Sequence, residues 1–182
     1  PKQLTSGAFN FGAPVWAPDM KTLYFSANLH EDYEYDPRNS EVYALDLSSS
    51  KITSLTNRPG PDNSPAVSPD GKKIAYLGFD DRFQGYQITN VYVMNVDGSG
   101  SKNISTKFDR DPNNLTWSSN SDKLFFQYND KGDTKIASMN MNGKVTDLVN
   151  SVGGMSLGRP YSAGTHSITA NGKYAYTMGA SD

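Results

Sequence analysis

Short runs of hydrophobic residues recur along this chain and are separated by turn residues. One unit, PVWAPDMKTLYFSA, begins at Pro14, and related units begin at Pro65, Leu115 and His166. An Asp or Asn marks a tight turn in each unit, and consecutive turn residues are 50 or 51 positions apart: Asp19, Asp70, Asn120 and Asn171. Because Pro-Asp and Asn-Gly favour turns and short alternating runs are typical of strands, the pattern predicts a repeated β-structure.

Each unit is interpreted as four strands, A to D, with strand A ending at the turn. The apolar run after the turn is strand B, at residues 23–26, 74–77, 124–127 and 174–177. Strands C and D follow at 41–45 and 52–55, 91–94 and 102–105, and 135–139 and 145–149. A four-stranded meander with this repeat length is typical of a β-propeller blade, with tandem hairpins as the alternative. We predict an all-β fold, a partial β-propeller of about three and a half four-stranded blades.

The register predicts a single propeller segment over residues 1–182. Residues 1–12 are expected to hold strand D of a preceding blade and a link, followed by blades at 13–59, 60–110 and 111–152 and an incomplete blade at 153–182. A partial ring leaves strand edges unpaired, so we expect the natural chain to extend at both ends and the segment to self-associate through open edges. A closed four-bladed ring is a weaker alternative, since its last blade would lack strand C.

Composition and charge add mainly exclusions. Gly, Ser and Tyr are plentiful and 36% of residues are hydrophobic, as expected for short strands joined by turns. The net charge is −2, and the two signs are interspersed, so we predict neither nucleic-acid binding nor a basic membrane patch. No apolar run reaches the roughly 20 residues that span a bilayer. The absence of cysteine excludes disulfides and thiolate metal sites but does not decide the compartment.

The segment GMSLG at residues 154–158 matches the G-x-S-x-G nucleophile elbow of α/β-hydrolases and precedes His166. An elbow needs a buried strand before the serine and a helix after it. Here Arg159 and Pro160 follow directly, and no Asp or Glu lies between Ser156 and His166, although the hydrolase order requires an acid there. We therefore interpret Ser156 as a loop serine and predict no catalytic residue in this chain.

The stretches SPAVSPDGKKIAYLGFDD, VYVMNVDGSG and NSEVYALDLSSSKITSLT resemble the propeller repeats of the prolyl oligopeptidase family of serine peptidases. The resemblance covers essentially the whole chain. Within the family, the chain is similar in particular to the bacterial acylaminoacyl-peptidase and dipeptidyl-peptidase-like members. The Ser-Pro-Asp-Gly turn is shared with the propeller of the Tol system. The third repeat departs from the pattern, with SNSD at residues 119–122.

The resemblance implies that the parent protein is a serine-type peptidase in a bacterial cytoplasm or periplasm. Its peptide substrates would reach a C-terminal α/β-hydrolase domain absent from this segment. The segment itself is then a non-catalytic cap that gates access to that domain, and no cofactor is implied. The alternative is a Tol-like or scaffold propeller that acts as a protein-binding module.

The loops between strands B and C are long in the first two blades, NLHEDYEYDPRNS and GFDDRFQGYQITN. In an ABCD meander they share one face with the D–A loops, and long propeller loops carry recognition. We expect their acidic side chains to pair with a peptide's free amine and their aromatic side chains to supply apolar contact, with a solvated acidic loop as the alternative. The candidate contact residues are Glu31, Asp32, Tyr33, Glu34, Tyr35, Asp80, Asp81, Arg82, Phe83, Tyr86 and Arg159.

Other noticeable residues receive structural interpretations. The segment DRDPN at 109–113 begins like a calcium loop, but Asn114 and Asn120 stand where that loop needs Gly and Glu, so we predict a turn and no metal. Two distant histidines without cysteine argue against a zinc site. Trp16 and Trp117 occupy equivalent strand A positions and are predicted to lie in the core. Arg159 is expected to contact a ligand carboxylate or to form a structural salt bridge.

Overall fold

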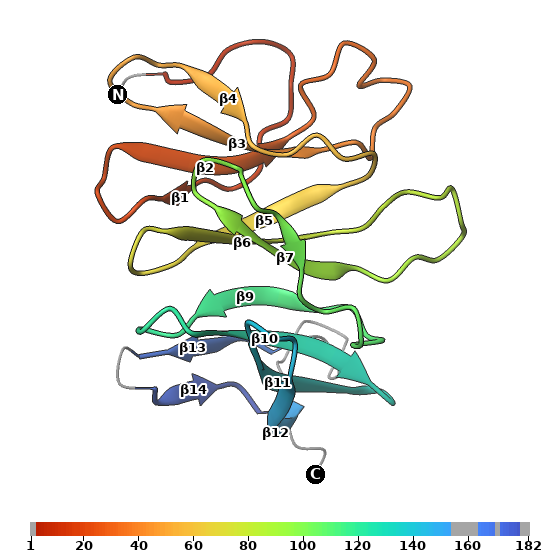
Figure 1. The fold of residues 1–182 in the computed structure, drawn as a ribbon. Coiled ribbons are helices and arrows are strands. Elements are labelled where there is room, and N and C mark those ends of the chain that lie inside the picture. The colour runs from red at the N-terminus through yellow and green to blue at the C-terminus, as the bar shows by residue number, and fades with distance from the viewer. Residues whose placement is uncertain (1–2, 154–163, 170–171, 179–182) are drawn as a thin grey trace.

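The computed structural model describes residues 3–153, 164–169 and 172–178, which form sheets stacked in chain order (Figure 1). The first sheet contains β1 (Val15–Trp16), β2 (Thr22–Ala27), β3 (Glu41–Asp46) and β4 (Ile52–Ser54). The second contains β5 (Asp62–Val67), β6 (Lys73–Gly78), β7 (Asn90–Asn95) and β8 (Lys102–Asn103). The third contains β9 (Asn113–Trp117), β10 (Lys123–Asp130), β11 (Asp133–Asn140) and β12 (Val145–Val152). A hairpin of β13 (His166–Ile168) and β14 (Tyr174–Tyr176) follows.

Strand order follows chain order within each sheet, and every pairing is antiparallel. The predicted runs B and C coincide with the second and third strands of each four-stranded sheet. The described ranges contain no helix, and hence none that is long and apolar enough to cross a bilayer. The predicted all-β fold, a partial β-propeller of four-stranded sheets, is therefore confirmed.

The same tight turn joins the first and second strands of each unit. Its fourth residue has a positive φ in all four copies, between 59° and 80°, at Met20, Gly71, Ser121 and Gly172. The N–H of each of these residues donates to the carbonyl three positions earlier at 2.8–3.0 Å. Only glycine adopts this left-handed conformation without steric cost. Met20 and Ser121 stand where the other copies have glycine and keep the same turn geometry, so these two residues are strained.

Side chains of a central strand alternate between the two neighbouring sheets. On β6, Ile74 and Tyr76 belong to the core shared with the first sheet, whereas Ala75 and Leu77 belong to the core shared with the third. All four side chains are buried. A strand buried on both faces is apolar throughout, which explains why residues 74–77 lack the alternation of a half-exposed strand.

The two tryptophans differ, and the prediction that both lie in the core is wrong for Trp16. Trp117 is 7% exposed, and its indole N–H donates to the Ala66 carbonyl of the second sheet at 2.9 Å. Trp16 is 51% exposed. The second sheet precedes β9 and covers Trp117, whereas no sheet within the described residues precedes β1 to cover Trp16. The position is equivalent, but its surroundings are not.

Residues 3–10 form no strand in the structure. Phe11 makes a single bridge with Ala27, and Leu4 and Phe11 pack on the side of the first sheet that carries Leu23 and Phe25. The N-terminal segment therefore covers part of that face. The assignment of residues 1–12 to a strand of a preceding blade stays a prediction.

We expect Met20→Gly to raise the free energy of unfolding by about 0.5–1 kcal/mol, because glycine removes the left-handed strain at a small entropic cost. Chemical denaturation of the two proteins measures this difference. The reverse change at the equivalent turn, Gly71→Met, is expected to lower stability by a similar amount. A less stable Met20→Gly protein would contradict the interpretation.

Candidate functional site

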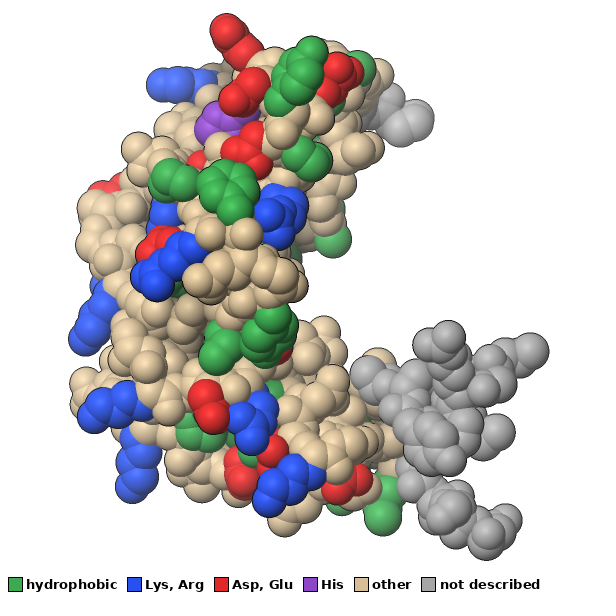
Figure 2. Space-filling view, turned by 90° about the vertical axis from the view of Figure 1, so that its right-hand side faces the viewer, with side chains coloured by type: hydrophobic (Ala, Val, Ile, Leu, Met, Phe, Trp, Pro, Cys, Tyr) green, Lys and Arg blue, Asp and Glu red, His purple; other side chains and the backbone are tan. Residues whose placement is uncertain are grey.

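Two long loops lie at the same end of the first and second sheets. Residues 28–40 join β2 to β3 and residues 79–89 join β6 to β7, at the right-hand ends of the strands in Figure 1. The linkers between sheets, residues 55–61 and 104–112, begin at that end too. We call this surface the loop face. Figure 2 looks onto it and shows an arc-shaped surface, with acidic side chains at its upper end and, among basic ones, at its lower end.

The first loop presents acidic and aromatic side chains to solvent. Glu31, Asp32 and Glu34 are exposed, and no described Lys, Arg or His lies within ion-pair distance of them. Tyr35 is 91% exposed. Tyr33 is half-buried, and its ring lies edge-on to that of Phe9 with the centroids 5.2 Å apart. The three carboxylates and Tyr35 are therefore available for contact, whereas Tyr33 supports the loop.

In the second loop, Asp81 organises the backbone. Its Oδ1 accepts hydrogen bonds from the Phe83 N–H at 2.7 Å and the Gln87 amide at 2.8 Å, and its Oδ2 lies 2.9 Å from Arg38 of the first loop. These interactions, the Phe83 bond first, lower the pKa of Asp81. The carboxylate thus holds its own loop and links it to its neighbour, so its oxygens are already engaged. The pairing of Asp81 with a peptide amine stays a prediction.

The tip of the second loop exposes two aromatic rings. Phe83 has a φ of 54° and is 83% exposed, and Tyr86 is 67% exposed. The Tyr86 hydroxyl donates to Asp111 at 2.6 Å, which raises the pKa of Tyr86. Asp111 also accepts the Thr89 N–H at 2.7 Å. The linker to the third sheet therefore holds this loop through Tyr86 and Thr89, while the Phe83 ring stays exposed.

Two open hollows lie beside these loops. One, of about 450 Å³, is lined by Phe79, Asp80, Arg82, Tyr86, Ile88 and Asn90. The other, of about 380 Å³, is lined by Phe11, Ser26, Asn28, Tyr33, Pro37 and Ser40. The structure thus places four predicted contact residues at hollows: Tyr33, Asp80, Arg82 and Tyr86.

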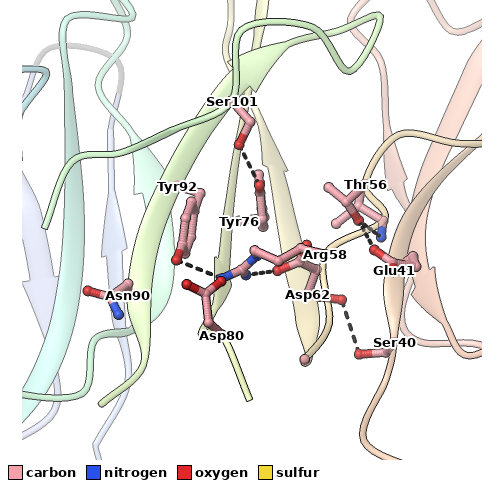
Figure 3. Close-up of polar contacts among 12 residues, drawn as sticks. Ser40, Glu41, Thr56, Arg58, Asp62, Tyr76, Asp80, Asn90, Tyr92 and Ser101 are labelled. Carbon is pink, nitrogen blue, oxygen red and sulfur yellow. Dashed lines mark hydrogen bonds and ion pairs between the residues drawn. The ribbon is translucent and has the colours of Figure 1, made fainter. Parts of the chain in front are cut away.

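Beneath the loop face, a buried cluster of charged groups joins the first two sheets (Figure 3). Arg58 of the linker donates to Asp62 at the start of β5, to Asp80 at 3.0 Å and to the Tyr92 hydroxyl at 2.6 Å. Its guanidinium also lies 4.1 Å from the centroid of the Tyr92 ring. Burial works to lower the pKa of Arg58, but Asp62 first, together with Tyr92 and Asp80, more than offsets it, so Arg58 stays charged. A side chain at Gly78 would collide with both Arg58 and Asp62.

A second buried carboxyl lies next to this pair. Glu41 opens β3, is 1% exposed and accepts a hydrogen bond from the Thr56 hydroxyl. His30 Nε2 lies 3.4 Å from the other Glu41 oxygen. Burial, above all, raises the pKa of Glu41 to about 7. The Thr56 hydrogen bond and His30 act in the opposite direction, and nearby Asp62 adds to the rise.

The family profile PD40, described as the TolB β-propeller domain, matches residues 2–163. The chain belongs to this family. TolB of the Tol-Pal system from Francisella tularensis is 33% identical over 95 residues, which are 50% of this chain and 19% of that protein. Dipeptidyl-peptidase 5 of Porphyromonas gingivalis is 21% identical over 136 residues, 73% of this chain and 20% of that protein.

Solved structures agree with the PD40 assignment. TolB from Acinetobacter baumannii has a TM-score of 0.62 and 27% identity, over 82% of this chain and 35% of that one. Puromycin hydrolase has a TM-score of 0.67 and 17% identity, over 94% of this chain and 28% of that one, a likeness that shows the fold alone. The chain spans 19% of the length of the first curated relatives it matches.

The remaining sequence candidates do not form a site in the described part of this PD40 propeller. Ser156 and Arg159 lie outside the described residues, so both interpretations stay predictions. His166 is half-buried, burial lowers the pKa of its imidazole, and no described group hydrogen-bonds to it. Within the described ranges, no three His, Asp or Glu side chains gather as metal ligands.

The sequence analysis missed the buried cluster of this propeller. Arg58 and Asp62 lie four residues apart in the linker NRPGPD, a spacing that suggests an ion pair only once both are known to be buried. Thr56 has a counterpart one repeat later in Ser105. Val42 N–H donates to Thr56 at 3.0 Å, as Val91 N–H donates to Ser105 at 2.8 Å. The recurrence of a hydroxyl after strand D is the signal that would have revealed this buried contact between the first two sheets, which we call the joint.

We expect Arg58→Met to lower the free energy of unfolding by about 3 kcal/mol, because it leaves the Asp62 charge buried without a cation. Adding Asp62→Asn to that protein is expected to recover at least about 1 kcal/mol. Urea denaturation of the single and double variants measures both values. Arg38→Met is the matched control: it breaks a half-exposed ion pair with Asp81 and is expected to cost less than about 1 kcal/mol. Equal losses for the two single variants would contradict the assignment.

Proposed function

We propose that this PD40 propeller is a non-catalytic protein-binding module and that its loop face contacts the partner protein. The observation that carries the proposal is the set of exposed side chains on two anchored loops: Tyr35, Phe83 and Tyr86 are each at least 67% exposed. Aromatic side chains dominate protein interfaces, and large exposed apolar groups on a fixed backbone are typical of binding sites.

The anchoring of the loops supports this proposal. Arg38 and Asp81 form an ion pair between the two loops at 2.9 Å, and the Asp81 N–H donates to the Pro59 carbonyl of the linker at 3.0 Å. The aromatic rings are therefore presented from a backbone that is already ordered, which reduces the entropy lost on binding. The likeness to TolB proteins, which belong to a Tol-Pal system, supports a protein partner.

A second candidate is that the propeller caps the catalytic domain of a serine-type peptidase. The sequence match to dipeptidyl-peptidase 5 covers 73% of this chain at 21% identity, whereas the sequence match to Francisella TolB covers 50% at 33% identity. In this case the loop face lies toward a C-terminal α/β-hydrolase domain and gates the access of peptide substrates. Glu31, Asp32 and Glu34 then supply carboxylates for a peptide's free amine.

We expect Tyr35→Ala combined with Phe83→Ala to weaken partner binding at least about tenfold, because each change removes an aromatic contact. A photo-crosslinking residue at position 35 or 83 of the full-length protein identifies the partner, and calorimetry with the purified partner gives the Kd. Met20→Ala is the control, since Met20 is also a large exposed side chain, 60% exposed, but lies in a turn at the opposite end of the sheet. Equal affinities of the double variant and the control would contradict the proposal.

For the peptidase candidate, we expect Glu31→Ala with Glu34→Ala to raise KM for peptides with a free N-terminus several-fold. An exposed ion pair contributes about 0.2–1 kcal/mol, so two lost pairs give roughly a two- to thirtyfold change. The KM for the same peptides with a blocked N-terminus is expected to stay constant. Full-length protein that hydrolyses neither peptide would exclude this candidate and leave the binding module.

A further inference from the structure

The joint between the first two sheets holds more acidic than basic groups. Three carboxyls belong to it, Glu41, Asp62 and Asp80, whereas Arg58 is its single permanently charged cation among the described residues. Glu41 and Asp62 are 1% and 0% exposed. Arg58 pairs with Asp62 and Asp80, and the only described basic group at ion-pair distance from Glu41 is the His30 imidazole. An ionised Glu41 is therefore a buried charge without a permanent cation, which is costly unless a proton neutralises it.

The two buried acids, Glu41 and Asp62, adjoin a backbone contact between the start of β3 and the start of β5. The Asp62 N–H donates to the Ser40 carbonyl at 2.7 Å, and the Ser40 hydroxyl donates back to the Asp62 carbonyl at 3.2 Å. Ser40 immediately precedes Glu41, so repulsion between the two carboxylates acts on this contact. The Asp62 Oδ2 has no hydrogen-bond partner within the described residues, and burial raises the pKa of Asp62 as well.

The second sheet contains the same arrangement without the charge. Asn90 opens β7 as Glu41 opens β3, and its side-chain oxygen accepts the Ser105 hydroxyl at 3.1 Å. Ser105 in turn accepts the Val91 N–H. A neutral amide therefore suffices for the structural role of this position. The carboxyl of Glu41 adds a titratable group that the fold does not require.

We propose that Glu41 is a proton-operated switch in the joint between the first two sheets: protonated, it holds the linker of residues 55–61 tightly, and ionised, it loosens that linker. The groups that interact with Glu41 are His30, Tyr43, Thr56 and Asp62. Arg58, Asp80 and Tyr92 lie one step further away, in contact with Asp62 or with each other. Of these, only His30 offers a second positive charge, and it is partly exposed. The joint adjoins both loops, because residues 28–40 end directly before Glu41 and Asp80 belongs to residues 79–89, so loosening also shifts the two loops relative to each other.

The pH range follows from the sign of the shift. The pKa of Glu41 is higher in the folded chain than in the unfolded one, so the folded state binds the proton more tightly. Its contribution to stability is complete below the ordinary glutamate pKa and is lost as the pH rises to about 7. Above that pH the contribution stays flat. Any effect on partner binding rests on the proposed function, but the titration itself needs no partner.

The test is an NMR titration of the full-length protein labelled with carboxyl-¹³C glutamate, in which Glu41→Gln assigns the Glu41 signal. We expect a midpoint above about 6 and, by hydrogen exchange, weaker protection of residues 55–61 at pH 8 than at pH 5.5 after correction for intrinsic exchange. Glu41→Gln is expected to abolish the pH dependence, and Glu34→Gln, an exposed control, to leave it unchanged. Asn90→Asp is expected to install a similar dependence in residues 104–112.

Two results would overturn the proposal. One is a Glu41 midpoint at or below about 6, near the ordinary carboxyl range. The other is a Glu41 midpoint above about 6 together with hydrogen-exchange protection of residues 55–61 that is the same at pH 5.5 and pH 8. Both measurements are made on the unmodified protein, and if Glu41→Gln does not fold, a through-bond correlation to the Glu41 backbone assigns the signal instead. A failure of partner binding leaves both readouts intact, so the two proposals fail separately.

Discussion

The stacking of one sheet on the next is the constraint on which the rest of this structure depends. Each central strand contacts a neighbour on both faces, so its residues are apolar in unbroken runs, as in residues 74–77 of β6. Because both faces of these strands are packed, polar side chains lie mainly at the two ends of the sheets, in the turns at one end and in the loops at the other. The division between a uniform turn end and a variable loop end follows directly.

Polar groups that lie between sheets must satisfy one another. Arg58 lies between the first and second sheets and donates hydrogen bonds to Asp62, to Asp80 and to the Tyr92 hydroxyl. Gly78 leaves the room for it. The same linker that carries Arg58 also contacts both loops. The Pro59 carbonyl accepts the Asp81 N–H of the second loop, and the Gly60 N–H donates to Asn39 of the first. The interior of the joint and the surface above it are thus one mechanical unit.

The sequence predicted those parts of the fold that are local. The turn at Asp70 and Gly71 depends on four consecutive residues, so its recurrence was visible as a repeat, and the strands followed from it. Trp16 was misplaced because its burial depends on a neighbouring sheet rather than on its own strand. Asp81 looked like a free carboxylate because nothing in the sequence shows that its own loop occupies it. Glu41 and Thr56 are 15 residues apart and meet only through strand pairing, so no local pattern connects them.

The outermost strands differ in length, and this has a consequence for solubility. β4 and β8 have three and two residues, whereas β12 has eight. A very short outer strand offers few free N–H and C=O groups to another chain, which is how many sheet proteins prevent aggregation. Within the described residues, β12 pairs on one side only, with β11. Its other side is therefore where intermolecular strand addition would begin, with the exposed Asp147 as a charge that opposes it.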